Sequence, residues 1–299
     1  MGPEASERSR ECLDHALALD PGFALPYVGL ADYHLARTTV GGLRAPDSMP
    51  RARELAQRAL AIDPNLPEGH AMLGIVAGHY DLDWVECRRR FELARAREPI
   101  HGHVRQQGAL FNLQARGLAE EGWAQTMKVV EDDPLCQMWH YSSALSLSGL
   151  GRHAEALATT QRSVDIDPAF WIGWHALSML HSAHGRHADA LRCAEQAFAA
   201  APWCPYTIGV MGGALEALGD HARAQPHVAT LRDDAYRGPA GLILYHAALN
   251  RADEALASAM DAIDRKFILV LPLVVRPLQW KLSTSPRWPA FLERARLER

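Results

Sequence analysis

The sequence lacks several features that would indicate common classes of protein. It has no run of about eighteen apolar residues, so it predicts no membrane-spanning helix. It also has little excess charge, because 31 lysines and arginines stand against 35 aspartates and glutamates, a formal net charge of -4. Surfaces that bind nucleic acid or anionic membranes are usually strongly basic. We therefore expect neither a nucleic acid nor a membrane to be bound directly.

Cysteine is scarce and is poorly placed for a disulfide framework or a zinc site. The five cysteines are an odd number, lie far apart and form no Cys-x-x-Cys pair. The first ten residues are polar and charged rather than apolar, so they predict no secretory signal peptide. Together these absences favour a reducing, cytoplasmic location.

What the sequence does contain is a regular series of prolines. Most follow an aspartate or a glutamate, and the intervals between them are 43, 35, 35, 34 and 34 residues. The series consists of Pro21, Pro64, Pro99, Pro134, Pro168 and Pro202. Proline cannot extend a helix and pushes the preceding residue out of the helical region. Each of these prolines therefore predicts the end of one helix and the start of the next.

Small residues lie five, eight and twelve positions before these prolines. Ala190, Ala194 and Ala197 before Pro202 are one example. This spacing places the small side chains on one face of a helix, where they allow a neighbouring helix to approach closely. The pattern therefore predicts the second helix of an antiparallel pair.

Glycine marks the turn inside each predicted pair. Gly151, Gly185 and Gly219 follow the first helix of three successive pairs, where glycine suits the left-handed end of a helix. At an earlier turn, Asp83 and Glu86 have the spacing of a helix capping box.

The repeating pattern resembles the tetratricopeptide repeat. It consists of an aromatic residue, a leucine and a glycine, a triplet of small residues and a closing proline, and its period is near 34 residues. The best copies are residues 137–170 and 171–204. The resemblance implies an all-α, right-handed superhelical solenoid of antiparallel helix pairs. We predict a lone second helix in residues 1–23, about seven repeats in residues 24–265, and a capping segment with a final helix in residues 266–299.

Two irregular turns and the C-terminal end carry a narrower resemblance. They are an extended first turn at Thr38–Pro50, the turn Asp81–Trp84, and the sequence Ser285–Leu292. They are similar to the tetratricopeptide regions of bacterial adenylate cyclases, winged-helix regulators and serine/threonine kinases. This resemblance implies that the chain is the regulatory or sensory part of a larger bacterial signalling or transcription protein, with an effector domain upstream. The lone second helix in residues 1–23 indicates that the chain is cut within a repeat. A free-standing adaptor protein is the alternative.

In tetratricopeptide proteins the first helix of each pair lines a concave groove, and its exposed side chains contact the partner. On this sequence that face is neutral and rather apolar, without the lysines, asparagines and arginine of a carboxylate clamp. We predict a protein or peptide partner with aromatic or aliphatic anchors. The alternative is that these side chains only pack against neighbouring helices. The predicted groove residues are His103, Gln106, Leu110, Tyr141, Leu145, His175, Met179 and Tyr206.

The fifteen histidines suggest a metal site or an enzyme, but their positions argue against both. His153, His187 and His221 follow repeat turns, and His181 falls at a position where paired helices pack. The sequence contains no zinc-protease, phosphate-loop, dinucleotide or nucleophile-elbow motif. We predict no catalysis, no metal and no cofactor, with a histidine-dependent metal-binding protein as the less favoured alternative.

The repeat pattern stops after Lys266. Phe267–Val275 is an apolar stretch that leads through Pro277 toward a final helix. Since a solenoid must cover its last apolar face, we interpret this stretch as a cap on the final repeat. A membrane-associating tail is the alternative.

Overall fold

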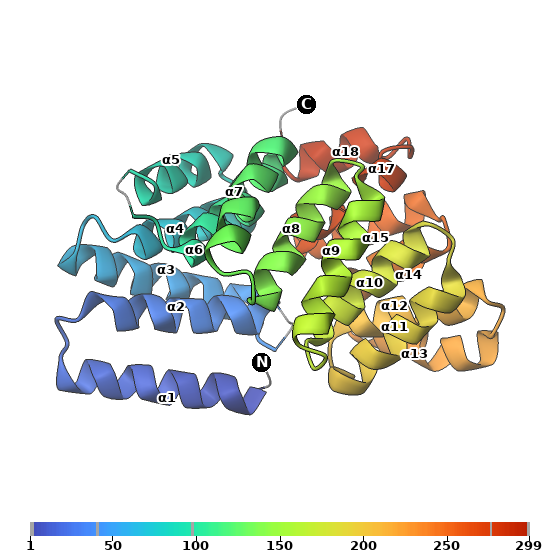
Figure 1. Ribbon diagram of the computed structural model, residues 1–299, viewed down its shortest axis with the longest axis horizontal. Helices are drawn as coiled ribbons and strands as arrows, with labels where there is room; N and C mark the ends of the chain where they lie inside the picture. The colour runs from blue at the N-terminus through green and yellow to red at the C-terminus, as the bar shows by residue number, and fades with distance from the viewer. Residues whose placement is uncertain (1–2, 40–41, 97–98, 276, 298–299) are drawn as a thin grey trace. The chain divides into compact units, whose positions relative to one another are not determined.

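The computed structural model describes residues 3–39, 42–96, 99–275 and 277–297 (Figure 1). In these ranges the regular elements are all helices, and consecutive helices pack against one another in pairs. The prediction of an all-α solenoid of helix pairs is therefore confirmed. The chain divides into two compact units, residues 1–112 and residues 113–299.

Unit 1 is a series of consecutive helices, each in contact with the next from α1 to α5. Its helices are α1 (Pro3–Leu19), α2 (Ala24–Thr39), α3 (Ala45–Ile62), α4 (Pro67–Ile75), α5 (Trp84–Ala94) and α6 (Gly102–Gly108). A π-helical stretch, η1 (Val76–Asp81), continues α4, and another, η2 (Ala109–Leu113), continues α6. Glu98, which precedes Pro99 in the predicted series of prolines, lies outside the described residues.

The prediction of a long first turn at Thr38–Pro50 is wrong, because its first two residues end α2 and residues 45–50 begin α3. Pro46 lies at the start of the helix, where no intrahelical N–H bond is required. Ala45, Met49 and Ala52 are fully buried at helical spacing. Burial of this face outweighs the bond lost at Pro50, one turn further on. The described part of the turn is residues 42–44, since residues 40 and 41 lie outside the described ranges.

The turn before α5 confirms half of the predicted capping box. The Asp83 carboxylate accepts a hydrogen bond from the Glu86 backbone N–H at 2.9 Å, which caps the helix. The Asp83 N–H instead donates to the carbonyl of Ala77, the second residue of the π-helical stretch. The Glu86 carboxylate binds Arg89 and Arg90, and the hydrogen bond from Arg89 lowers the pKa of Glu86 to about 2.

Unit 2 contains the most regular repeats. Its long helices are α7 (Ala119–Asp132), α8 (Gln137–Gly149), α9 (His153–Ile166), α10 (Trp171–Ala183), α11 (His187–Ala200), α12 (Pro205–Ala217), α13 (His221–Asp233), α14 (Gly238–Ala248) and α15 (Ala252–Asp264). A 3-10 turn, η3 (Gln114–Arg116), precedes them, and α16 (Val270–Val274), α17 (Gln279–Leu282) and α18 (Trp288–Arg294) follow. We call α8, α10, α12 and α14 the first helices of their pairs.

The turns and small-residue faces of unit 2 agree with the sequence pattern. Gly151, Gly185 and Gly219 adopt φ angles of +73°, +72° and +82°, the left-handed conformation that glycine adopts without strain. Ala190 and the other two alanines of its triplet are fully buried. The Ser178 hydroxyl of α10 donates to the Ala190 carbonyl of α11 at 2.8 Å, so the two helices are in close contact there.

We expect Ala190→Arg to destabilise the protein by about 3 kcal/mol or more, because it forces a charged, bulky side chain into this contact. Urea unfolding followed by circular dichroism measures the change. Ala199→Arg, on the exposed face of the same helix, is the matched control and should leave stability within about 0.5 kcal/mol. Equal stability of the two variants would contradict this packing.

Candidate functional site

The first helices of unit 2 form a continuous face. α10 contacts α8, α12 and α14, and α12 contacts α14 directly. A Cβ atom added to Gly209 would lie 2.2 Å from the backbone oxygen of Gly241, so the backbones of α12 and α14 touch at this point. We call the side of unit 2 lined by these first helices the inner face.

The C-terminal segment, which we define as residues 267–275 and 277–297, covers part of this face. The Phe267 ring lies 6.1 Å from the ring of Tyr206 on α12 and 5.6 Å from the ring of Tyr236. The apolar side chains that follow it are buried. They are Ile268, Val270, Leu271, Val274, Val275, Leu278 and Leu282. The segment therefore does more than cover the last helix pair, because it also reaches earlier helices and η3.

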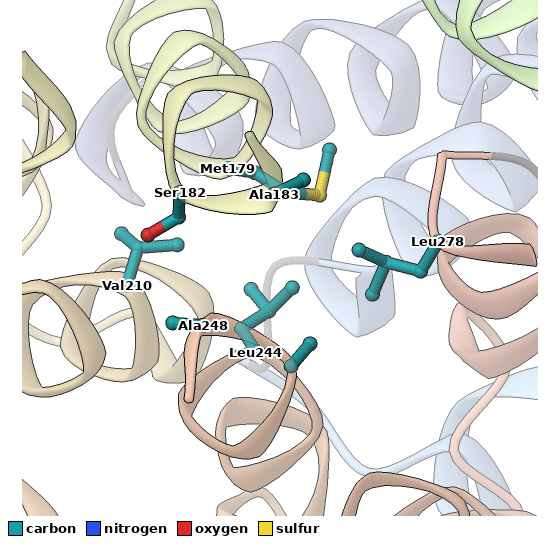
Figure 2. Close-up of a pocket in the computed structure, with 8 residues that line it drawn as sticks. Met179, Ser182, Ala183, Val210, Leu244, Ala248 and Leu278 are labelled. Carbon is teal, nitrogen blue, oxygen red and sulfur yellow. The ribbon is translucent and has the colours of Figure 1, made fainter. Parts of the chain in front are cut away.

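Leu278 closes a small apolar pocket on the inner face. The other walls come from α10, α12 and α14, including Met179, Val210 and Leu244. The space is about 240 Å³, including the solvent at its mouth. Figure 2 shows the Leu278 side chain pointing from the C-terminal segment toward Leu244 and Met179. The aliphatic side chain of Leu278, from the C-terminal segment, thus forms one side of this pocket.

Trp280 forms an aromatic contact at the turns of two neighbouring repeats. Its indole stacks on His184 with ring centroids 5.5 Å apart and an angle of 14° between the planes. It also lies 5.1 Å from His153, and the two imidazoles are 4.7 Å apart. Trp280 remains 40% exposed, so it covers the imidazoles while keeping one side in solvent.

Polar contacts attach the far end of the C-terminal segment to α15. The Ser285 hydroxyl donates to the Asp253 carboxylate at 2.5 Å, and Arg294 forms an ion pair with Asp264 at 2.6 Å. Phe291, which lies between Ser285 and Arg294 in the sequence, is fully buried. Ring contacts of Phe267 and Trp280 therefore hold the first part of the segment, and polar contacts with α15 hold its last part.

The three predicted groove residues of unit 1 lie on α6 and the π-helical stretch after it. Gln106 and Leu110 are buried, whereas His103 is about half exposed. The Gln107 amide lies 2.8 Å from His103 and donates to Asp32 on α2 at 3.2 Å. Burial alone would lower the pKa of His103, but the hydrogen bond and charge of Asp32 outweigh it and raise the pKa.

The predicted groove residues of unit 2 lie on α8, α10 and α12. Tyr141 is half-buried, with its ring edge-to-face against Phe170 at 6.2 Å. His175 and Tyr206 are buried with ring centroids 5.7 Å apart. Burial lowers the pKa of His175 to about 4 and raises that of Tyr206. Leu145 is buried as well.

The expectation that the predicted groove side chains are exposed is wrong for six of the eight. Only His103 and Tyr141 are not buried; Gln106, Leu110, Leu145, His175, Met179 and Tyr206 are. Neighbouring first helices pack closely, and the C-terminal segment covers Met179 and Tyr206. Partner contact at these positions stays a prediction. The sequence analysis missed Phe267, Leu278 and Trp280, although the apolar run after Lys266 signals a segment that must be buried.

Two observations on the described side chains concern metal binding and thiol reactivity. Over those residues, no group of three or more histidine, cysteine, aspartate or glutamate side chains is arranged to hold a metal ion. Burial raises the pKa of the Cys193 and Cys204 thiols to about 11, which disfavours the reactive thiolate.

None of the helices that the structure describes combines the length and the apolar character needed to cross a membrane.

Solved structures resemble this chain, although no protein-family model and no curated protein sequence matches it. A tetratricopeptide repeat protein from Parabacteroides merdae has a TM-score of 0.51 and is 13% identical, over 83% of this chain and 98% of that chain. This chain has the tetratricopeptide-repeat fold. PilW, a type IV pilus biogenesis factor, has a TM-score of 0.56 at 15% identity, over 71% of this tetratricopeptide-repeat chain and 93% of that chain.

A third similar structure corrects one expectation about partners. Human IFIT1 with m7Gppp-AAAA has a TM-score of 0.65 at 16% identity, over 98% of this chain and 68% of that chain. Another IFIT1 structure contains PPP-AAAA. The prediction that nucleic acid is ruled out as a direct partner is therefore wrong. Net charge describes the whole chain, whereas binding depends on the local surface that a tetratricopeptide-repeat fold presents.

We expect Gly209→Ala to destabilise the protein by about 2 kcal/mol or more, because the new methyl group would separate α12 from α14. Gly108→Ala is the matched control, since its added Cβ would meet only ordinary contacts at 3.5 Å and beyond. Thermal unfolding of both variants measures the difference. An unchanged melting temperature for Gly209→Ala would contradict the close contact of these helices.

Proposed function

We propose that this chain is a protein-interaction scaffold, and that unit 2 binds an apolar segment of a partner protein on its inner face. The observation behind this proposal is that the chain's own C-terminal segment lies on the inner face. Phe267 and Leu278 lie on the first helices, and Trp280 lies at the adjacent turns, as the anchors of a bound peptide would. Recognition through a few buried anchors is the common mode for segments that bind in grooves.

The chemistry of the inner face defines the kind of segment that fits. Tyr206 and Tyr236 meet an aromatic ring, and the pocket at Met179 and Leu244 takes an aliphatic side chain. The stretch Phe267–Val275 carries no charge, so a matching partner segment is apolar over a similar length. We propose an aromatic residue followed by aliphatic residues as its minimal pattern.

We further propose that the scaffold acts as the regulatory or sensory part of a bacterial signalling or transcription protein. This rests on the resemblance of the sequence Ser285–Leu292 and of the turn Asp81–Trp84 to the regions attached to cyclases, regulators and kinases. A free-standing adaptor uses the same inner face and is the alternative.

Peptide binding to the full chain tests the proposal. The probe is residues 267–282 joined to a fluorescent carrier domain, with binding followed by anisotropy. Leu278→Asp places a carboxylate in the apolar pocket and weakens the hold on the chain's own segment. We expect this variant to bind the probe about tenfold more tightly than the natural chain, since the internal competitor is released.

Two further variants make the result specific. Adding Met179→Glu to Leu278→Asp should remove probe binding, because the pocket wall becomes charged. Leu218→Asp, at an exposed site after α12, is the matched control and should behave as the natural chain. No gain in affinity on Leu278→Asp, or unchanged binding after Met179→Glu in a folded protein, would overturn the proposal.

A further inference from the structure

We infer that the contact of Trp280 with His153 and His184 is a pH-sensitive latch, which holds the C-terminal segment on the inner face at neutral pH and releases it in mildly acidic solution. The inference deepens the proposed function and rests on it, because the latch controls whether the same face is open to a partner. Its basis is a cluster of titratable groups that the scaffold function does not otherwise use.

The geometry places one aromatic residue over two imidazoles. His153 is the first residue of α9, and His184 directly follows α10. The stacked indole of Trp280 bridges them, so separation of the three rings requires the C-terminal segment to move. Lys281, the next residue along α17, brings a positive charge close enough to act on His184 and His187.

The charged groups around these rings are mainly cationic. The described groups that face the cluster are His153 on α9, His181 and His184 at the end of α10, Arg186 in the turn, His187 and Asp189 on α11, and Lys281 on α17. Asp189 is the nearby carboxylate, but it forms an ion pair with Arg192 at 2.5 Å and lies nearest His181, at 3.9 Å. Arg152, beside His153, pairs with Glu155.

These surroundings disfavour protonation of the docked imidazoles. Burial lowers the pKa of His153, of His184 and of His187. The charges of His153, Arg186 and Lys281 lower the pKa of His184 further. His153 and His187 also begin α9 and α11, where the positive end of the helix dipole opposes an added positive charge.

Docking also leaves imidazole nitrogens without hydrogen bonds. Nδ1 of His153, Nε2 of His184 and Nδ1 of His187 are buried and have no partner among the described residues. A protonated imidazole donates from both nitrogens, so protonation raises the cost of burying them. Release of the segment lets water reach these atoms.

The direction of the pH effect follows from these shifts. Near pH 7.5 the imidazoles are neutral in both states, and docking is at full strength. As the pH falls through about 6.5, the ordinary pKa of histidine, the released state binds protons that the docked state resists. Docking of the C-terminal segment therefore weakens as the pH falls. The weakening stops when the pH reaches the lowered pKa values of the docked imidazoles.

Hydrogen exchange of the full chain at pH 7.5 and pH 5.5, corrected for the intrinsic pH dependence of exchange, tests the latch. We expect the amides of residues 270–282 to exchange about tenfold faster at pH 5.5, because the released imidazoles bind protons that the docked imidazoles resist. The amides of α12 serve as the internal reference and should change much less.

Substitution separates the latch from a general acid effect. His153→Gln with His184→Gln should remove most of the pH response of residues 270–282, because Trp280 contacts these two imidazoles directly. His221→Gln is the matched control and should keep it, because His221 begins α13 in the same way but faces the Glu216 carboxylate at 3.1 Å. A pH response that persists in the double variant, or none in the natural chain, would overturn the latch.

The two proposals can fail independently. If the probe peptide binds the Leu278→Asp chain and the natural chain shows no pH response, the latch is wrong and the scaffold stands. If residues 270–282 are released at low pH and the probe never binds, the segment moves as inferred but the inner face is not a binding site for such a segment.

Discussion

Close contact between helices through small side chains is the constraint on which the structure of unit 2 depends. Fully buried alanines let α11 lie against α10, and glycines let the backbones of α12 and α14 touch. The first helices consequently share one continuous apolar face. Exposing an apolar face to water is unfavourable, and the C-terminal segment covers part of this one.

Local features of this fold could be predicted from sequence because each depends on a few neighbouring residues. The left-handed glycines at 151, 185 and 219 and the cap formed by Asp83 are examples. The first turn was misassigned because buried contacts of Ala45 and Met49 favour helix where Pro46 and Pro50 suggest a loop. Tertiary packing outweighed local propensity there.

The candidate site was harder to predict, because its essential parts lie far apart in the chain. Phe267 contacts Tyr206, and Trp280 contacts His153 and His184, each more than 60 positions earlier in the chain. No local pattern encodes such contacts. The predicted groove residues of unit 2 lie on α8, α10 and α12, and the exposure of Met179 and Tyr206 depends on where the C-terminal segment lies.

The central claim is that the C-terminal segment occupies the inner face of unit 2 in solution. A photo-crosslinking amino acid at position 278 of the full chain, with the products mapped by mass spectrometry, tests it most directly. The account predicts intramolecular crosslinks to residues of α10 and α14, including Met179 and Leu244. Crosslinks confined to α15, or none within the chain, would contradict it.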